Sequence, residues 1–459
     1  MRILFALTHI NFWLQMEAAG RELEARGHEV TVLLDREMNK KFAERFERPE
    51  AGNEGADATQ VDWLKRRKDR WWAYTDGLRE LVNFLSYYSP RRAPFSETLA
   101  RRWAEFLPAR LKWLPECPGL CRFLASDGVS RLLRWLAERA PLYESIVKDL
   151  RKRKPDVMVA AATFLPHSLE LEYLRTARRL GLRTAVIVPS WDNLTTKGIF
   201  HVLPDRVLVW NAAQVEEAVA MLRLPRERLA VTGAPRYDLW FNLRPRLSAA
   251  EFRAEAGLAP AGPVIVWLCS SGFIAKDEVA IVREVAAHLA ADPGWTSRGG
   301  QLLVRPHYQN LPQWRAAADA AKEGFSLWPH PDKLERFQTG DLHQGLFDTL
   351  YHSAGAVGIN TSAFLEAAVV DRPCFAILDP RVAGTQSDIP HFQHLIRGGF
   401  LQTAVEPGEL ARQLVATLAG EDPLREGRRH FVRDFLRPRG MEKAACEILA
   451  EEIVAVGEG

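Results

Sequence analysis

The chain has 459 residues, more than one ordinary hydrophobic core holds, so we expect two domains of roughly 200 residues each. Hydrophobic residues make up 47% of the sequence and charged residues 26%, which is the composition of a soluble globular protein. The net charge of +3 leaves the chain as a whole close to neutral.

Neither the N-terminus nor the cysteines indicate secretion. The first residues, MRILFALTHINFW, carry one arginine and a brief apolar run, which is not the pattern of a signal peptide. No uninterrupted apolar run approaches the ~20 residues that a membrane-spanning helix needs. The five cysteines are few, and Cys117-x3-Cys121 lacks a second pair of ligands, which argues against a zinc site. We therefore expect a cytoplasmic protein.

The first elements form a strand–helix–strand unit. Apolar runs predict strands at Arg2–Leu7 and His28–Leu34, and the amphipathic stretch Leu14–Ala25 predicts a helix that ends at Gly27. The two strands should be parallel with a right-handed crossover. The loop Thr8–Trp13 lacks the G-x-G-x-x-G fingerprint, so nothing indicates a nicotinamide or flavin cofactor.

Residues 36–61 are polar and irregular, and residues 62–150 interrupt the alternation of strands and helices. Apolar residues recur at helical spacing in this second segment, and prolines divide it into short helices. Between Asp62 and Lys154 we count 21 Lys and Arg against 11 Asp and Glu, with six of the fourteen tryptophans, so the rest of the chain is near −7. We interpret the segment as a helical insertion in the first domain, and its composition favours an anionic surface as partner.

Alternation resumes after the insertion and continues through the second half. Residues 242–262 carry proline, alanine and charge without strand character, which is typical of an inter-domain connection, and the tail from Leu424 to Val456 is charged and helical. The predicted strands are Val157–Ala161, Thr184–Val188, Arg206–Trp210, Leu229–Thr232, Val264–Cys269, Leu302–Val304, Ala356–Ile359 and Cys374–Ile377; the clearest helices are Leu169–Leu180, Ala212–Leu222, Val279–Leu289 and Gly408–Leu418.

The stretch Ala354–Ala368, AGAVGINTSAFLEAA, predicts an anion site. A short buried strand ends at Ile359, and Thr361 or Ser362 would cap the helix that follows the polar loop. A strand that leads into a helix N-terminus favours phosphate through free amides and the helix dipole. Glu366, about one turn into the helix, could accept hydrogen bonds from ribose hydroxyls. The alternative is an ordinary capped helix of an α/β protein.

Two further stretches place polar groups at the same edge of that predicted sheet. The strand Leu302–Val304 runs into Arg305 and His307, and ligands of open parallel sheets bind at the carboxyl ends of the strands. Arg305 and His307 could meet a diphosphate from one side, with the capped helix on the other. The small-residue turn Ser270-Ser271-Gly272 would let amides approach the same group, unless it is an ordinary strand-to-helix turn. Together these positions predict a nucleotide-diphosphate site.

Two doubly wound halves with nucleotide chemistry in the second and no dinucleotide fingerprint resemble the GT-B glycosyltransferases. Arg228–Asp238, RLAVTGAPRYD, resembles a phrase of nucleotide-sugar 2-epimerases and CDP-glycerol glycerophosphotransferases. Ser190–Gly198, SWDNLTTKG, is similar to the bacterial surface-carbohydrate and capsular-polysaccharide biosynthesis proteins of this superfamily. RPHYQN and INTSAFLEA resemble the donor-site motifs of that group. The resemblance covers most of the chain except roughly residues 40–150.

The resemblance implies an α/β protein of GT-B fold, with two doubly wound Rossmann-like domains facing a cleft and the helical insertion in the first. It implies an acceptor domain over residues 1–245, a nucleotide-sugar domain over 246–423, and a C-terminal helix at 424–459 that packs back towards the first domain. The implied reaction moves a sugar from a nucleotide-sugar to a cell-surface glycan or its lipid-linked precursor. Amides, arginine and a helix end would neutralise the leaving diphosphate, so we expect no metal and no other cofactor.

The same resemblance directs the search for a base to the first domain. Retaining relatives often carry two glutamates eight positions apart, and Gly358 stands eight before Glu366, so we expect inversion and a base for the acceptor hydroxyl. Asp192 in SWDNLTTKG is the first candidate, and its alternative is an Asx-turn that shapes the loop. His9 follows the first strand, where some GT-B enzymes keep a base histidine, or it merely lines a loop. His167 also follows a strand and is the third candidate.

The remaining candidates lie near the acceptor or the cleft. Asn193 and Lys197 share the SWDNLTTKG phrase, and Lys197 could bind an acceptor anion or the diphosphate. His391 and His394 either line the cleft or cap and pack a helix. The helices of residues 62–150 either lie on the inner face of the cell membrane, against its anionic lipids, or pack their tryptophans on the first domain. Nucleic acid is not expected, because no binding motif accompanies the charge.

Three alternative functions remain open from the sequence. A nucleotide-sugar 2-epimerase shares the VTG-x-P phrase and would form product without an acceptor. Glycerophosphate transfer differs mainly in the donor. A non-catalytic scaffold of a polysaccharide complex would bind no nucleotide at all.

Overall fold

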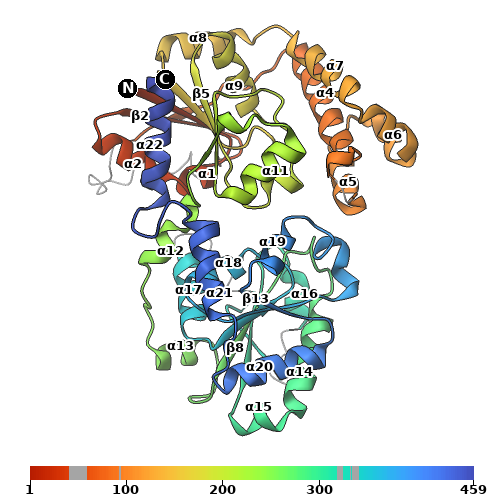
Figure 1. Ribbon diagram of the computed structural model, residues 1–459, viewed down its shortest axis with the longest axis vertical. Helices are drawn as coiled ribbons and strands as arrows, with labels where there is room; N and C mark the ends of the chain where they lie inside the picture. The colour runs from red at the N-terminus through yellow and green to blue at the C-terminus, as the bar shows by residue number, and fades with distance from the viewer. Residues whose placement is uncertain (41–58, 93–94, 318–323, 331, 333–340) are drawn as a thin grey trace. The chain divides into compact units, whose positions relative to one another are not determined.

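The computed structural model describes residues 1–40, 59–92, 95–317, 324–330, 332 and 341–459. The chain divides into two compact units, of which the first comprises Met1–Asp238 and Asp434–Gly459 and the second comprises Leu239–Arg433 (Figure 1). The chain therefore passes through the second unit once and returns to the first with its last helix.

The first unit is built on a seven-stranded sheet in the order β3-β2-β1-β4-β5-β6-β7, with every neighbouring pair parallel. In β1, Ala6 pairs with Leu33 of β2 on one side and with Ala160 of β4 on the other, so the carboxyl ends of these strands meet at one edge. The strands are β1 (Arg2–Leu7), β2 (Glu29–Leu34), β3 (Gln60–Trp63), β4 (Val157–Ala160), β5 (Arg183–Ile187), β6 (Arg206–Val209) and β7 (Leu229–Val231).

Helices cover both faces of this sheet, which is why its strands read as continuous apolar runs. Leu4 and Ala6 of β1 belong to a core with α8, α9 and α11, whereas Phe5 and Leu7 face α1, α2 and α22. The C-terminal helix thus completes the first unit (Figure 1). The helices are α1 (Ile10–Leu14), α2 (Glu17–Ala25), α8 (Glu144–Arg153), α9 (Glu170–Arg179), α10 (Asn193–Thr196), α11 (Ala212–Leu222) and α22 (Ala445–Glu458).

The insertion is shorter than the sequence predicts. Residues 60–63 form the edge strand β3, which is too short and too polar to show a clear pattern; residues 41–58 of the predicted irregular segment lie outside the described residues. Helix α8 packs on the sheet of the first unit and is not part of the insertion, because Ile146 and Leu150 lie in the core between α8 and the sheet. The remaining helices have a core of their own around Phe84, Trp103 and Leu114. They are α4 (Arg70–Ser86), η1 (Pro90–Arg92), α5 (Glu97–Ala104), η2 (Ala109–Leu111), η3 (Leu114–Glu116), α6 (Pro118–Leu124) and α7 (Asp127–Glu138).

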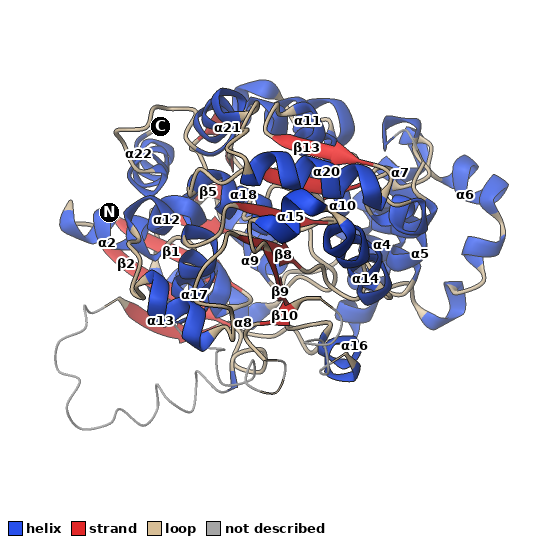
Figure 2. Cartoon of the chain, turned by 90° about the horizontal axis from the view of Figure 1, so that it is seen from below, coloured by secondary structure: helices blue, strands red, loops and turns tan. Residues whose placement is uncertain are grey.

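The second unit has a six-stranded parallel sheet in the order β10-β9-β8-β11-β12-β13 (strands red in Figure 2). Sequence analysis misses β10, which has two residues, and β13, which lacks an apolar run. The strands are β8 (Val264–Leu268), β9 (Gln301–Arg305), β10 (Ser326–Leu327), β11 (Gly355–Gly358), β12 (Cys374–Ile377) and β13 (Leu401–Ala404).

The predicted inter-domain connection at 242–262 contains the helix α13. Ser248 and Glu251 form a capping box, and the buried Phe252 packs edge-on against Trp328 at 5.5 Å between ring centroids. The helices of this unit are α12 (Asp238–Asn242, which begins at the boundary), α13 (Ala249–Glu255), α14 (Glu278–Ala291), α15 (Pro293–Ser297), α16 (Leu311–Ala316), α17 (Asp341–Tyr351), α18 (Ala363–Val369), α19 (Phe392–Arg397), α20 (Pro407–Leu418) and α21 (Arg425–Phe431).

The helical tail is broken rather than continuous. A five-residue π-helix, Val432–Leu436, follows α21 and leads into a non-helical stretch before α22, and Pro438 has no amide to donate there. Among the described residues, no helix combines the length and the apolar character needed to cross a membrane.

Candidate active site

Glu170 holds the carboxyl ends of β1 and β4 together. Its Oε1 accepts from the amide of Thr8 at 2.6 Å, and its Oε2 accepts from the amides of Ala161 and Ala162 at 2.8 and 2.7 Å. The side chain is fully buried, and burial raises its pKa. Because these amides begin the loops after two central strands, Glu170 fixes the sheet edge where the predicted site residues of the first domain lie.

Asp192, the first predicted base, is occupied inside its own loop. Its Oδ1 accepts from the hydroxyl of Ser190 at 2.6 Å and from the side-chain amide of Asn193 at 3.4 Å. Its Oδ2 accepts from the hydroxyl of Thr196 at 2.9 Å and lies 3.8 Å from Nζ of Lys197. A carboxylate offers about four lone-pair positions, and hydrogen bonds within the loop use three of them, so a substrate hydroxyl would compete with these partners. The geometry matches a loop-shaping residue.

Asn193 and Lys197 are part of the same loop structure. Asn193 is only 6% exposed, and its Oδ1 accepts from the amide of Ser190 at 3.0 Å. The Lys197 ammonium is partly buried beside Asp192. The structure therefore brings these two predicted acceptor residues to Asp192 rather than into an open position.

The SWDNLTTKG loop also anchors the insertion. The short helix α10 leaves carbonyls at its C-terminal end that need donors from elsewhere. Three buried side chains of the insertion supply them: Tyr87 donates to Lys197 at 2.9 Å, Trp103 to Thr196 at 3.0 Å, and Arg92 to Thr195 and Gly198 at 3.3 and 3.2 Å. The main-chain carbonyls of this loop thus hold the helices of the insertion against the rest of the first unit.

His9 lies at the carboxyl end of β1 and caps α1. Its Nδ1 accepts from the amide of Asn11 at 3.1 Å, so the neutral ring carries its proton on Nε2. Burial lowers the pKa of His9, which favours this neutral form. In this tautomer Nε2 is set to donate a hydrogen bond to a ligand rather than to accept a proton.

His167 forms a dyad with Asp76 of α4. Its Nδ1 lies 2.8 Å from Oδ2 of Asp76, and this hydrogen bond raises the pKa of His167. The ring packs edge-on against Phe106, and half of the side chain remains exposed. Because Asp76 accepts a hydrogen bond from the N–H group at Nδ1, Nε2 of the neutral ring carries no proton and can accept one. This is the arrangement of a histidine base that a carboxylate orients.

The backbone of His167 is fixed in an uncommon conformation. Its φ of 54° is in the left-handed region, and its amide donates to Oε1 of Glu80 at 2.9 Å. Glu80 is 2% exposed, and burial raises its pKa to about 7. Two acidic residues one turn apart on α4 therefore hold one histidine, Asp76 by the ring and Glu80 by the main chain.

Sequence reasoning found His167 but missed Asp76 and Glu80. One potential ligand atom of each residue lies within 4.8 Å of the others, so their residue types could also hold a metal ion. The two carboxylates lie in the insertion, far along the chain from His167, so ligand spacing does not reveal the cluster. Acidic residues at i and i+4 on a helix were the only signal.

In the second unit, Ser270 joins the carboxyl ends of β8 and β11. Its hydroxyl accepts from the amide of Asn360 at 3.3 Å, and its carbonyl accepts from the side chain of Asn310 at 3.3 Å. Its own amide donates to Oε2 of Glu278 at 2.9 Å, and burial raises the pKa of Glu278 to about 8. The predicted small-residue turn is present, but its first residue is engaged in holding the edge together.

The rest of this edge presents free backbone amides. The amides of Ser271, Gly272, Thr361 and Ser362 donate to no other residue in the described part of the chain. Ser362 stands at the N-cap of α18 without a side-chain capping bond, whereas Oγ1 of Thr361 accepts from the amide of Ala363 at 3.2 Å. Four unpaired N–H groups on two neighbouring loops are suited to an anion.

Gly358 allows those two loops to approach. A Cβ on Gly358 would lie 2.7 Å from the carbonyl oxygen of Leu268 and 3.3 Å from the ring of Phe364. Likewise, a Cβ on Gly272 would lie 3.2 Å from Oδ1 of Asn310. Small residues at this edge thus serve close backbone packing.

Arg305 ends β9 as predicted, but its guanidinium is engaged by α17. Nη1 donates to the hydroxyl of Thr349 at 3.0 Å, and the guanidinium carbon lies 5.2 Å from the ring centroid of Trp328. Burial lowers the pKa of Arg305 to about 10. The backbone carbonyl of Arg305 accepts from the amide of Cys269 at 3.1 Å, at the start of the loop after β8, so Arg305 lies at the same sheet edge while its guanidinium is hydrogen-bonded to α17.

His307 and Glu366 are both partly or fully covered. Nδ1 of His307 accepts from the amide of Gln309 at 3.1 Å, and burial lowers the pKa of His307, so its neutral ring donates through Nε2. Glu366 lies on α18 and is 5% exposed.

His391 stands at the N-cap of α19 without a side-chain capping bond and is 7% exposed. The amide of His394 donates to the carbonyl of His391 at 3.0 Å.

Comparison with known proteins finds likeness in structure only. No protein-family model matches the chain, and no curated protein matches it. A UDP-GlcNAc 2-epimerase from Methanocaldococcus jannaschii is similar with a TM-score of 0.51 and 10% identity, over 99% of both chains. A glycosyltransferase from Rickettsia africae ESF-5 gives 0.51 and 8%, over 100% of this chain and 98% of that one. Another solved UDP-N-acetylglucosamine 2-epimerase gives 0.52 and 10%, over 100% and 97%.

These structures share the arrangement described above, two Rossmann-like units each built on a parallel sheet. The chain has the two-domain GT-B fold, with a helical insertion in the first unit, so the predicted fold class is confirmed.

Proposed function

We propose that the protein is an inverting, metal-independent glycosyltransferase that moves a sugar from a nucleotide-sugar to a cell-surface glycan or a lipid-linked glycan precursor. The fold supports chemistry on nucleotide-sugars, because solved structures that share it are named as a glycosyltransferase and as UDP-GlcNAc 2-epimerases. The observation that carries the proposal is the His167–Asp76 dyad at the carboxyl end of β4. An inverting transferase needs such a base, and it must act on an acceptor hydroxyl.

In the proposed reaction, Nε2 of His167 takes the proton of the acceptor hydroxyl as its oxygen bonds to the anomeric carbon. The bond from that carbon to the diphosphate oxygen breaks, and the nucleoside diphosphate leaves with the electron pair. Asp76 keeps its hydrogen bond to Nδ1 and stabilises the imidazolium that forms. Asp192, with its carboxylate filled by its own loop, then has a structural role.

We assign the donor diphosphate to the free amides of Ser271, Gly272, Thr361 and Ser362. Preorganised donors aimed at the leaving group stabilise the charge that grows on it during transfer. His307 would donate a hydrogen bond from Nε2 to the diphosphate. Glu366 remains the proposed contact to the ribose. On this assignment Arg305 supports α17 rather than the phosphate.

The insertion supports an acceptor held at an anionic membrane surface. Phe123, Leu132 and Trp135 on α6 and α7 are 70%, 54% and 51% exposed, although they are large and apolar. Arg122 and Arg131 are their neighbours in the sequence, and the guanidinium carbon of Arg139 lies 4.4 Å from the ring centroid of Trp135, which is typical of helices that lie in the lipid interface. Vesicle flotation tests this part of the proposal: we expect binding to anionic vesicles that falls when Phe123 and Trp135 are both changed to serine, and equal binding by this variant would contradict it.

The decisive experiment starts with thermal-shift screening against UDP-, GDP-, CDP- and CMP-linked donors, CDP-glycerol included. UDP-sugars come first, because two of the similar solved structures are named for UDP-GlcNAc. The stabilising donor is then incubated with EDTA, with and without membrane-extracted acceptors. Release of nucleoside diphosphate only with acceptor supports the transferase. A nucleotide-sugar product formed without acceptor supports a 2-epimerase, the second candidate, and silence across the panel favours a non-catalytic scaffold.

A further inference from the structure

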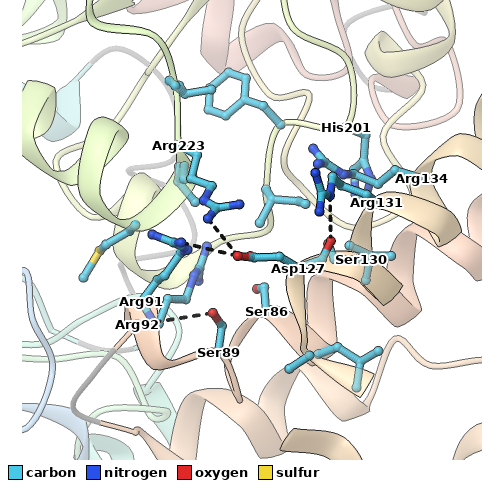
Figure 3. A pocket seen from close by; sticks show the side chains of 18 of the residues that line it. Ser86, Ser89, Arg91, Arg92, Asp127, Ser130, Arg131, Arg134, His201 and Arg223 are labelled. Atoms are coloured by element: carbon cyan, nitrogen blue, oxygen red, sulfur yellow. Dashed lines mark hydrogen bonds and ion pairs between the residues drawn. The ribbon is translucent and has the colours of Figure 1, made fainter. Parts of the chain in front are cut away.

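A pocket with a volume of about 190 Å³ lies between the insertion and the Rossmann core of the first unit (Figure 3). On the insertion side it is lined by α4, η1 and α7. On the core side it is lined by residues 199–203, which follow the SWDNLTTKG loop, and by the end of α11. None of the residues assigned above to the base or to the donor lines it.

The pocket is strongly basic. Its lining contains five arginines, Arg91, Arg92, Arg131, Arg134 and Arg223, and Asp127 is its one carboxylate. Oδ2 of Asp127 lies 2.7 Å from Arg223 and 3.4 Å from Arg91, so the single negative charge is shared by two arginines on opposite walls. Figure 3 shows the side chains of Arg131 and Arg134 on the far side of Asp127, beside His201. The lining therefore has a formal charge of +4.

In the described part of the chain, Arg131 and Arg134 have no carboxylate in direct contact, although the charge of Asp127 acts on both of them. Nε of Arg131 donates to the carbonyl of Asp127 at 3.3 Å, and neither arginine forms an ion pair with a carboxylate among the described residues. Nε of Arg134 is buried without a hydrogen-bond partner. Burial, together with the charges of Arg131 and Arg223, lowers the pKa of Arg134. Holding like charges together in a partly buried site is unfavourable unless an anion compensates them.

Arg92 gives the site a rigid wall. It is 5% exposed, its two terminal nitrogens donate to the carbonyls of Thr195 and Gly198, and its Nε has no partner. The guanidinium carbon stacks 4.4 Å from the ring centroid of Tyr87. These contacts fix one guanidinium of the pocket before any ligand binds, which lowers the ordering cost of binding.

Size and charge together select the class of ligand. Pockets for whole nucleotides or drug-sized molecules span about 300–1,000 Å³, which is more than this one offers. At about 30 Å³ per water, the pocket holds roughly six waters, enough for one or two phosphoryl groups. Arginine forks match phosphate oxygens in geometry. A ligand with one carboxylate would leave most of the formal charge of +4 uncompensated, whereas a phosphoryl or diphosphoryl group carries more negative charge.

We propose that the pocket between α7, η1 and α11 binds a phosphoryl or diphosphoryl group. The group comes either from a soluble phosphate compound or from the phosphate of a lipid. The proposal does not rest on the transferase reaction, because it concerns binding at a site away from His167 and from the donor loops.

Calorimetry on the full chain tests the proposal with inorganic phosphate and pyrophosphate, and flotation tests it with phosphatidic acid vesicles against phosphatidylcholine vesicles. Arg134→Gln and Arg131→Gln remove the two unpaired charges, and the exposed Arg131 can change without loss of a core contact. Arg110→Gln is the matched control, because Arg110 is an exposed arginine of the insertion that lies outside the pocket and is not one of the membrane-facing positions named above. Circular dichroism confirms that each variant is folded.

We expect pyrophosphate to bind the wild type and each pocket variant to lose at least tenfold in affinity, with Arg110→Gln unchanged. That result assigns a soluble phosphate ligand. Binding only to phosphatidic acid vesicles that is lost in Arg134→Gln, which is not one of the membrane-facing positions, and kept in Arg110→Gln supports the proposal with a lipid as the source. The proposal is overturned if neither probe binds, or if the pocket variants bind as well as the wild type does.

Discussion

Oδ2 of Asp76 lies 2.8 Å from Nδ1 of His167, which joins a helix of the insertion to the loop after β4. The hydrogen bond and the negative charges of Asp76 and Glu80 raise the pKa of His167. The insertion therefore does more than add a surface: it supplies the group that orients the proposed base.

This relationship predicts the pH dependence of transfer. A base acts when it is deprotonated, and the pKa of His167 is raised, so kcat/KM should fall as the pH drops through a value above 6.5. Asp76→Asn removes the largest cause of the shift and should move this acid limb to lower pH while also lowering kcat. His167→Ala should keep donor binding in thermal-shift assays and lose at least a hundredfold in kcat. An unchanged acid limb in Asp76→Asn would remove His167 from the mechanism.

The close packing of β8 and β11 predicts a strong effect of Gly358→Ala. The new Cβ would meet the backbone oxygen of Leu268 at 2.7 Å, and backbone cannot move aside without shifting the loops that carry the free amides. We expect a loss of about 1–3 kcal/mol in unfolding free energy, measured by denaturant titration, together with weaker donor binding. Gly128→Ala in α7 is the control, since its Cβ meets nothing within 4 Å and should stabilise the helix slightly.

Glu278 predicts a pH dependence of stability. Burial raises the pKa of this carboxyl to about 8, so the folded state holds its proton more tightly than the unfolded state does. The stability that this group contributes is present below about pH 4.5 and is lost as the pH rises to about 8, on the order of 4 kcal/mol. Glu278→Gln should remain neutral and flatten the decline of the melting temperature between pH 5 and 9. The control Glu284→Gln, on the exposed side of α14, should decline as the wild type does.

Arg134 predicts that the basic pocket lowers stability. Its folded-state pKa is depressed, so the charged side chain destabilises the native state at neutral pH. In phosphate-free buffer, Arg134→Gln should therefore have a higher melting temperature than the wild type, with a free energy of unfolding that is about 0.5–2 kcal/mol larger. Pyrophosphate should raise the melting temperature of the wild type and not that of the variant. A variant that melts lower than the wild type in phosphate-free buffer would contradict this account.

Much of the fold could be predicted because both sheets are parallel and buried. Strands such as Cys374–Ile377 are covered on both faces and read as continuous apolar runs, so their patterns stand out. β3 and β10 were not predicted from the sequence, because an edge strand has only one neighbouring strand and needs little apolar character. The GT-B resemblance rested on the same strong patterns, and it held.

The sites were harder because side chains at a strand end can turn in several directions. Sequence placed Arg305 at the carboxyl end of β9, but Thr349 and Trp328, which approach from other elements, decide where its guanidinium lies. Sequence named His167, but only the docking of α4 brings Asp76 to it. The five arginines of the basic pocket come from three separate stretches of the chain, and no local motif joins them.

The return of the chain to its first sheet has a consequence for synthesis on the ribosome. Leu449 and Ile453 of α22 fill the core that covers β1, yet the whole of Leu239–Arg433 is translated between them and Asp238. At ~5–20 residues per second this takes on the order of 10–40 s, during which the part of the sheet face that α22 covers stays open to chaperones, while α1 and α2 can already pack on the rest. The second unit is complete before the first, so the nascent chain acquires its proposed donor-binding half first and closes the other half last.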